Sequence, residues 1–158
     1  MLKSYLLTFL ISMVPLIELR GAIPFGTLVC DPPVPLVQAY IISIIGNMIP
    51  VPIIFFFARK VLEWGADKPV IGGFFTWCLN KGHKGGQKLL SATGHGVYVA
   101  LILFVGIPLP GTGAWTGTLA ASILDMDFKK SSACVMAGVL LAGVIIGALS
   151  AVGINVLQ

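Results

Sequence analysis

Charged residues are scarce in this chain of 158 residues. They make up only 10% of it, against about 25% in an ordinary soluble domain. Hydrophobic residues make up 57%, and the mean hydropathy is +0.99. These values exclude an ordinary soluble fold and predict an all-α integral membrane protein with a single transmembrane domain over residues 1–158, because helices satisfy their own backbone hydrogen bonds in lipid.

Side chains that carry catalytic or metal chemistry are also few. The three cysteines lie far apart, no C-x-x-C motif occurs, and neither histidine is spaced as a zinc partner, so we expect no disulfide framework and no metal. No Ser/His/Asp set, Cys/His set or H-E-x-x-H motif is present. Gly111, Gly113 and Gly117 do not have the spacing of a nucleotide-binding fingerprint. We therefore predict neither an enzyme nor a cofactor.

Positive charge collects in the centre of the chain. Residues 64–92 separate a first apolar half, residues 1–63, from a second, residues 93–158. By the positive-inside rule this basic segment is predicted to be cytoplasmic and the C-terminus to lie outside a bacterial-type inner (plasma) membrane. We expect the segment to lie on anionic lipid headgroups rather than to bind nucleic acid. A flexible linker with aromatic anchors is the alternative.

Two apolar runs are long enough to cross a bilayer. Residues 34–57 and 133–157 are each predicted to form a spanning helix, the first one kinked by Pro50 and Pro52. In the second run Gly143, Gly147 and Ala151 recur every four positions, a spacing that permits close helix approach. They either pack within the molecule or form a contact face, and we expect a homo-oligomer, most simply a dimer.

The other two apolar stretches are interrupted early. Pro15 and Pro108 come about a dozen residues after each stretch begins, and a helix of that length rises only about 18 Å, too little to cross. Each stretch is therefore predicted to be a re-entrant helical hairpin, and the two hairpins with the two spanning helices to form an inverted repeat. The residues assigned to the hairpin tips are Pro15, Gly21 and Pro24 in the first, and Pro108 and Pro110 in the second.

Glu18 and Arg20 lie two residues apart in the first of these hairpins. Ionisable groups at membrane depth are rare and are functional candidates by default. The guanidinium of Arg20 suits phosphate or carboxylate, and Glu18 is the candidate proton-coupling group. The alternative is a neutralising ion pair that only allows the hairpin to exist in lipid.

Backbone donors are expected at the second tip. Gly111, Thr112 and Gly113 precede a helix predicted to begin near Ala114, where backbone N–H groups can bind an anion. The alternative is that these glycines only permit a sharp reversal. Asn47, in the middle of the first spanning run, is a further candidate, either for contact with the substrate or for a hydrogen bond to a hairpin tip.

Two motifs carry a resemblance to a known family: Glu18-Leu19-Arg20-Gly21-Ala22-Ile23-Pro24 and Pro108-Leu109-Pro110-Gly111-Thr112-Gly113-Ala114-Trp115-Thr116-Gly117. Over nearly its whole length the chain resembles the small multidrug export protein family, which is similar in turn to the larger DedA membrane proteins. That resemblance implies two inward-pointing hairpins with acidic and basic residues, and a role in moving undecaprenyl phosphate or other lipids. The second DedA hairpin carries two arginines, and this second tip has none.

These features predict a membrane transporter or flippase for an amphiphilic anion such as a polyprenyl (undecaprenyl) phosphate, coupled to protons. The expected partners are this lipid-like substrate, protons and anionic membrane lipids. A proton-coupled exporter of hydrophobic cationic drugs is one alternative. A membrane assembly factor that transports nothing is the other.

Overall fold

The computed structural model describes residues 1–58, 60, 64, 72, 73, 76, 80, 96–109, 111–124 and 126–157. Most of the basic segment 64–92, as well as Pro110, lies outside the described residues. All the elements of the described part are helical. They are α1 (Leu2–Met13), α2 (Glu18–Pro24), η1 (Phe25–Val29), α3 (Leu36–Met48), α4 (Pro50–Ile53), η2 (Ile54–Ala58), α7 (Gly96–Gly106), α8 (Ala114–Ile123) and α9 (Phe128–Leu157).

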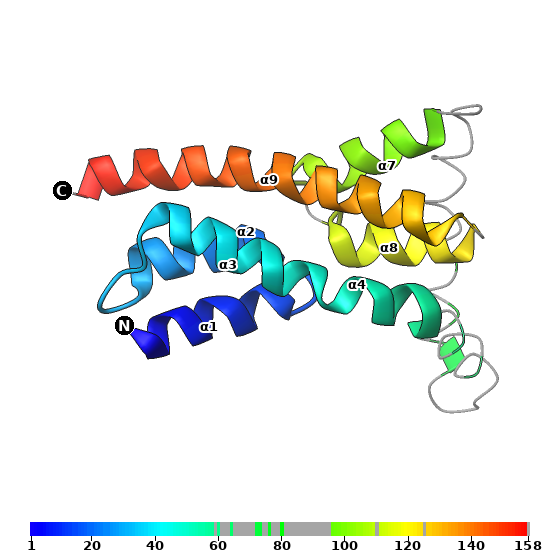
Figure 1. Cartoon of the computed structure of the whole chain (residues 1–158), viewed down its shortest axis with the longest axis horizontal. Helices are drawn as coiled ribbons and strands as arrows, with labels where there is room; N and C mark the ends of the chain where they lie inside the picture. The colour runs from blue at the N-terminus through cyan, green and yellow to red at the C-terminus, as the bar shows by residue number, and fades with distance from the viewer. Residues whose placement is uncertain are drawn as a thin grey trace.

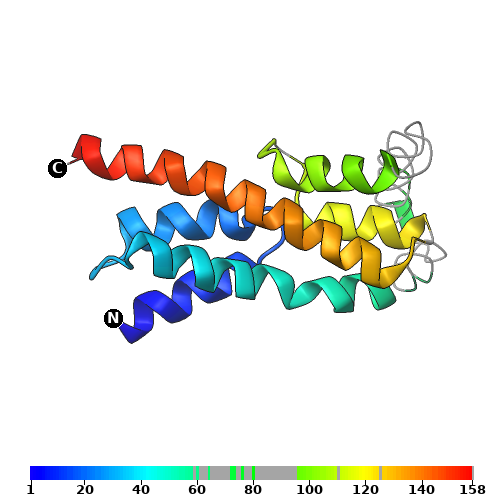
Figure 2. The same ribbon diagram turned by 45° about the horizontal axis from the view of Figure 1, so that its top comes forward.

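Two long helical rods run the length of the molecule in opposite directions (Figures 1 and 2). One is the succession α3–α4–η2, and the other is α9. A pair of shorter helices, α1 and α2, enters from the end where both termini lie, and a second pair, α7 and α8, enters from the opposite end (Figure 1). The two pairs point their connecting turns toward each other near the middle of the molecule.

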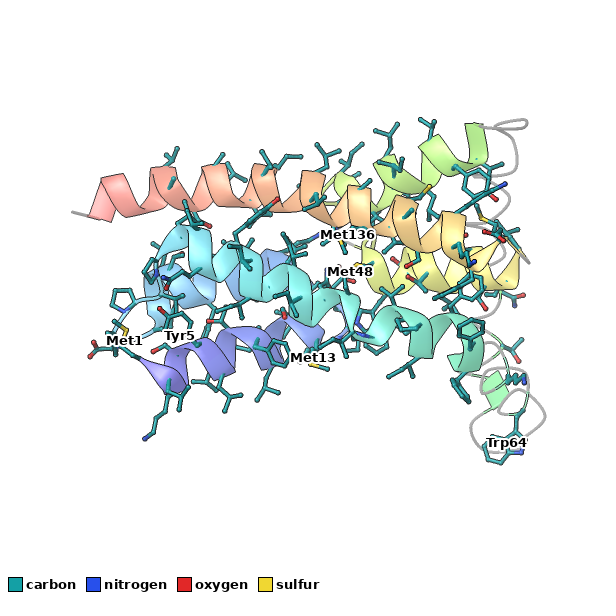
Figure 3. The ribbon with its side chains drawn as sticks, viewed as in Figure 1. Met1, Tyr5, Met13, Met48, Trp64 and Met136 are labelled. Carbon is teal, nitrogen blue, oxygen red and sulfur yellow. The ribbon has the colours of Figure 1, made fainter. Side chains whose placement is uncertain are left out.

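The lengths of the helices fall into two classes. The continuous apolar helices Leu36–Phe57, with 22 residues, and Phe128–Gly153, with 26, are long and apolar enough to cross a membrane. They fall on the two runs predicted to span. By contrast α1, α7 and α8 have 12, 11 and 10 residues, or about 15–18 Å at 1.5 Å per residue. Met13 at the end of α1 accordingly lies midway between Met1 and Trp64 (Figure 3).

The first rod is irregular where its prolines fall. Regular α-helix stops at Met48, resumes at Pro50, and passes into the π-helix η2. Proline lacks a backbone N–H, which leaves helical carbonyl groups without their usual donor. Ser122 of α8 donates a hydrogen bond of 2.6 Å to the carbonyl oxygen of Phe55, so a neighbouring helix supplies a donor to this irregular segment.

The second rod begins earlier than the apolar run alone indicated. It starts at Phe128 instead of residue 133. Asp127 Oδ1 accepts a hydrogen bond of 2.9 Å from the backbone N–H of Lys130. A side-chain cap of this kind satisfies one of the free donors of a first helical turn, which explains why residues 128–132, ahead of the apolar run, are helical.

Small residues bring α1 against its neighbours. Ser4, Thr8 and Ser12 form a buried stripe along α1. Added Cβ atoms on Gly26 and Gly46 would collide with Thr8 and Ser12, so α1 lies very close to η1 and α3. Close packing through Ser, Thr and Gly is typical of helices in membranes, and the sequence reading did not identify this stripe.

The apolar core lies along α9. Its largest members on this helix and on α7 are Val135, Val139, Leu101 and Val105. Gly143 packs inside the molecule, because a Cβ there would meet the ring of Tyr40, whereas one on Gly147 would meet nothing within 4 Å. The small-residue stripe predicted on this helix is thus divided between an internal contact and an open position.

Candidate functional site

Glu18 is buried at the junction between the two short-helix pairs. Its side chain is 4% exposed. The carboxylate oxygens accept hydrogen bonds from two backbone N–H groups at the start of α8, from Ala114 at 3.2 Å and from Trp115 at 3.0 Å. The N-terminus of a helix carries partial positive charge and unsatisfied donors. The first hairpin therefore places an anionic group on the α8 N-terminus of the second.

The backbone around Glu18 is strained. The residue has φ +51°, and Leu16 in the preceding turn has φ +73°. Non-glycine residues seldom adopt positive φ, and such strain persists only where the surrounding structure enforces it. Here the tight turn over residues 14–17 delivers the carboxylate directly to α8.

Gly113 permits the close approach of the two hairpins. It has φ +143°, and a Cβ atom at this position would lie 2.7 Å from Glu18 Oε1. Gly111 also has positive φ, +83°, but a Cβ there would meet nothing within 4 Å. Gly113 thus serves both the turn and the contact, and Gly111 serves the turn alone.

Arg20 extends to the other side of the same tip. Its guanidinium donates to the carbonyl oxygens of Leu109 at 2.6 Å, Val105 at 3.3 Å and Ile107 at 3.4 Å, and to Thr112 Oγ1 at 3.0 Å. The carbonyl groups that end a helix lack intrahelical donors and carry partial negative charge. Val105 lies in the last turn of α7, and Ile107 and Leu109 lie in the loop that follows. Arg20 therefore binds carbonyl groups at and just beyond the C-terminal end of α7, while Glu18 binds the start of α8.

We call the group formed by Glu18, Arg20, Thr112, Gly113 and the first two residues of α8 the hairpin junction. Each charge binds the second hairpin through the hydrogen bonds of its side chain. The two charges also stabilise each other electrostatically without a direct hydrogen bond. Opposite charges matched to opposite helix ends are a favourable arrangement.

Asn47 of α3 lies beside this junction. Its side chain is fully buried, and neither Oδ1 nor Nδ2 makes a hydrogen bond of normal geometry. The amide is nevertheless near enough to Glu18 to interact with its carboxylate. Buried polar groups normally have partners, so an unpaired amide next to a buried carboxyl group needs an explanation.

Of the residues assigned to the hairpin tips, some lie in turns and others lie inside a helix. Pro15 lies in the first turn and Pro108 in the second loop. Gly21 and Pro24 lie inside α2 and not at the tip, which corrects the prediction. The physical reason is that residues 14–17, with Leu16 at positive φ, already complete the reversal, so the helix has begun by Glu18.

Apolar side chains surround the tips on the molecular surface. Leu16 is 83% exposed, Leu109 55%, and Ile17 and Ile107 43% each. Such residues are expected to face lipid tails or an apolar ligand when a protein lies in a bilayer. The buried carboxylate of Glu18 is thus separated by a short distance along the chain from a lipid-compatible surface.

The sequence did not predict the partners of the two charges. It indicated a helix near Ala114 whose N-terminus can bind an anion, but not that Glu18 itself occupies it. The available signal was that Gly106 and the prolines after it end α7, which leaves carbonyl groups in need of a donor. Among the described residues no group of three or more His, Cys, Asp or Glu could hold a metal ion.

Fold and site together define a helical membrane protein in which a buried carboxylate and a half-buried guanidinium join two helical hairpins. The chain belongs to the family described as putative small multi-drug export protein, whose sequence model matches residues 18–145. The match begins at Glu18, directly after the first turn, and includes Arg20, the second tip and most of α9. An export family is not an enzyme class. No curated protein and no solved structure gives a significant match.

Proposed function

We propose that this protein is a proton-coupled transporter, or flippase, for an amphiphilic anion, most concretely a polyprenyl phosphate. The headgroup binds at the hairpin junction and the apolar tail stays in the bilayer. Arg20, the backbone around Thr112 and Gly113, and the α8 N-terminus hold the headgroup. Glu18 carries the proton.

The observation that carries this proposal is the occupancy of the α8 N-terminus by a carboxylate of the chain itself. Two backbone N–H groups already converge on an anionic group at 3.0 and 3.2 Å. The Arg20 guanidinium binds Thr112 in the same tip at 3.0 Å. A phosphate group suits both kinds of donor, so displacement of Glu18 turns an internal contact into a substrate site.

The arrangement of helices supports a site near the bilayer midplane. The short helices α1, α7 and α8 each cover about half of a hydrocarbon core that is about 30 Å thick. Non-helical backbone at such a depth is tolerated where it is buried in protein or lines a cavity. Each half of the chain also has two short helices followed by a rod, as expected of an inverted repeat with broken helices at the binding site.

The charges at the two ends support one orientation. Lys129 and Lys130 lie in the first turn of α9, at the end where η2 also finishes (Figure 1). The opposite end carries both termini. Since basic residues favour the cytoplasmic side, we place the start of α9 inside and the termini outside an inner (plasma) membrane.

Export of hydrophobic cations is the second candidate, and the description of the family favours it. In that mechanism a cationic drug and a proton compete for Glu18, so drug and proton move in opposite directions. In the anion mechanism the proton and the headgroup are carried together. The direction of transport in a pH gradient therefore separates the two candidates.

The test is a flux assay in liposomes that contain the purified protein and a pH gradient. A polyprenyl phosphate and a lipophilic cation are measured in parallel, with Arg20→Ala as the site variant and Lys3→Ala, at an exposed position in α1, as the control. We expect the anion to move toward the alkaline side, with loss of transport in Arg20→Ala only. Movement of the cation toward the acidic side would establish the second candidate, and movement of neither substrate would favour a non-transporting assembly factor.

A further inference from the structure

Glu18 has two different kinds of partner within reach. The α8 N-terminus offers two N–H donors, from Ala114 and Trp115. Asn47 offers one acceptor, Oδ1, and one donor, Nδ2, in a fully buried side chain; neither atom makes a hydrogen bond of normal geometry, but the amide lies within reach of the Glu18 carboxyl group. The two partners therefore present different hydrogen-bonding patterns to the same carboxyl group.

The protonation state of Glu18 decides which partner fits. An ionised carboxylate only accepts hydrogen bonds, whereas a protonated carboxyl group has one O–H donor and one carbonyl acceptor. The ionised form thus matches the two donors of α8, as in the observed geometry, and it can use only Nδ2 of Asn47, which leaves Oδ1 without a donor. The protonated form matches an amide, because its O–H donates to Oδ1 while its carbonyl oxygen accepts from Nδ2.

We propose that Asn47 is the partner to which Glu18 moves when it takes up a proton, and that this exchange opens the α8 N-terminus to the anionic substrate. The inference deepens the proposed function, on which it rests for the substrate. The proton comes from water on one side of the membrane, resides on a carboxylate oxygen of Glu18, and is released to water on the other side. No other bond forms or breaks.

The surroundings of Glu18 allow this exchange. Arg20 is the only charged group that acts on Glu18 in the part of the chain that the structure describes. The helices α1, α3, α8 and α9 bring no titratable side chain to it there. With Glu18 neutral and turned to Asn47, Arg20 becomes the uncompensated charge of the junction, which favours entry of an anion.

The exchange explains how one small site can bind both a proton and an anionic headgroup. While Glu18 is ionised it occupies the donors that a phosphate needs, so the anion binds only after the proton does. Proton and headgroup then move together, and the empty protein resets when the ionised Glu18 returns to Ala114 and Trp115. Asn47 is a positioning residue in this scheme and touches no substrate.

Infrared spectroscopy of the purified protein in lipid tests the exchange without any substrate. Acidification should give a carbonyl band of protonated Glu18 that is absent from Glu18→Gln. In Asn47→Leu, which keeps the size but removes the amide, this band should shift to higher frequency. In Thr118→Val it should not move, although Thr118 is equally buried and its hydroxyl also lacks a partner.

A second measurement uses an unmodified sequence and so avoids any folding defect. The chain has three asparagines, Asn47, Asn80 and Asn155, and nitrogen-15 labelling of asparagine alone shows their side-chain amides by magnetic resonance without those of glutamine. One amide signal should shift on acidification, and the shift should vanish in Glu18→Gln. An unmoved infrared band in Asn47→Leu, or the absence of any Glu18-dependent band, overturns the exchange. If the protein transports the anion but the Glu18 band does not shift in Asn47→Leu, the exchange is wrong and the transport function stands. If the band shifts but no anion is transported, the transport function is wrong and the exchange stands.

Discussion

At the scale of single residues, Gly113 sets how closely the two hairpins approach. Its backbone has φ +143° and ψ −174°, a region that is open to glycine almost exclusively and costs about 1–3 kcal/mol for other residues. A Cβ atom there would also meet the carboxylate of Glu18. The residue is therefore constrained by its conformation and by its neighbour at once.

We expect Gly113→Ala to destabilise the protein clearly more than Gly111→Ala. Gly111 has a left-handed φ but open space around its Cα, so alanine there should cost only about 1–2 kcal/mol. At Gly113 the hydrogen bonds between Glu18 and α8 are lost in addition. Unfolding of both variants in mixed micelles, followed by circular dichroism, measures the difference. Equal stabilities would show that Gly113 does not hold Glu18 close to α8.

Arg20 should not be replaceable by lysine. Its planar fork binds three carbonyl groups and one hydroxyl group, and an ammonium group cannot reproduce that geometry. Loss of one or two charged hydrogen bonds at about 1.5–3 kcal/mol each predicts a fall of about tenfold or more in transport rate for Arg20→Lys. Thr112→Val, which removes only the hydroxyl partner, should have a smaller effect. An Arg20→Lys variant as active as the unchanged protein would contradict this role.

The identities of the charged residues were predictable from the sequence, but their partners were not. Glu18 and Arg20 stand out because ionisable residues in apolar runs are costly. Their hydrogen bonds depend on the turn at residues 14–17, which directs one side chain to the start of α8 and the other to the end of α7. Asn47 was found as a candidate, yet its unpaired amide is evident only when α3 is packed beside α2.

At the scale of helices, α7 packs closely against α9 at Gly138. A Cβ atom on Gly138 would lie 2.6 Å from Val105 Cβ and 2.8 Å from the carbonyl oxygen of Ile102. Backbone and β-branched side chains have little freedom to move away, so the two helices depend on glycine at this position.

We expect Gly138→Ala to separate α7 from α9 and to lower stability by about 1–3 kcal/mol, as overpacking does in other cores. Gly147→Ala is the matched control on the same helix, because nothing lies within 4 Å of a Cβ there. Alanine at Gly147 should leave stability unchanged or raise it through better helix propensity. Equal effects of the two substitutions would argue against close packing at Gly138.

The existence of the two rods was predictable because their apolar runs exceed the length needed to cross a bilayer. The details of their ends and kinks were not. The early start of α9 depends on the cap from Asp127, and the π-helix η2 depends on how α8 packs against it through Ser122. Gly21 and Pro24 were assigned to a tip because both residues favour turns in general, although here the chain reverses before them.

At the scale of the whole molecule, both termini lie at the same end (Figure 2). We predict that cysteines placed at Lys3 and Val152 react with a membrane-impermeant maleimide from outside intact cells, and that one at Lys129 reacts only after the membrane is opened. The native cysteines are replaced first. If the cysteines at positions 3 and 129 reacted from the same side of the membrane, the proposed topology would be wrong.

A homodimer stays a prediction. The stripe that suggested it is partly used within the molecule, since Gly143 packs against Tyr40. Gly147 and Ala151 remain accessible in part. The DedA likeness also stays a prediction, because the family match concerns small multidrug export proteins alone.

The central claim is that the hairpin junction lies in the middle of the bilayer, and Trp115 reports on it directly. This residue donates its backbone N–H to Glu18. With Trp64 and Trp77 replaced by phenylalanine, Trp115 is the sole tryptophan of the chain. Its fluorescence in liposomes of lipids brominated at different depths should be quenched most strongly by bromine near the ends of the acyl chains. Strongest quenching by bromine close to the headgroups would contradict a site at the membrane midplane.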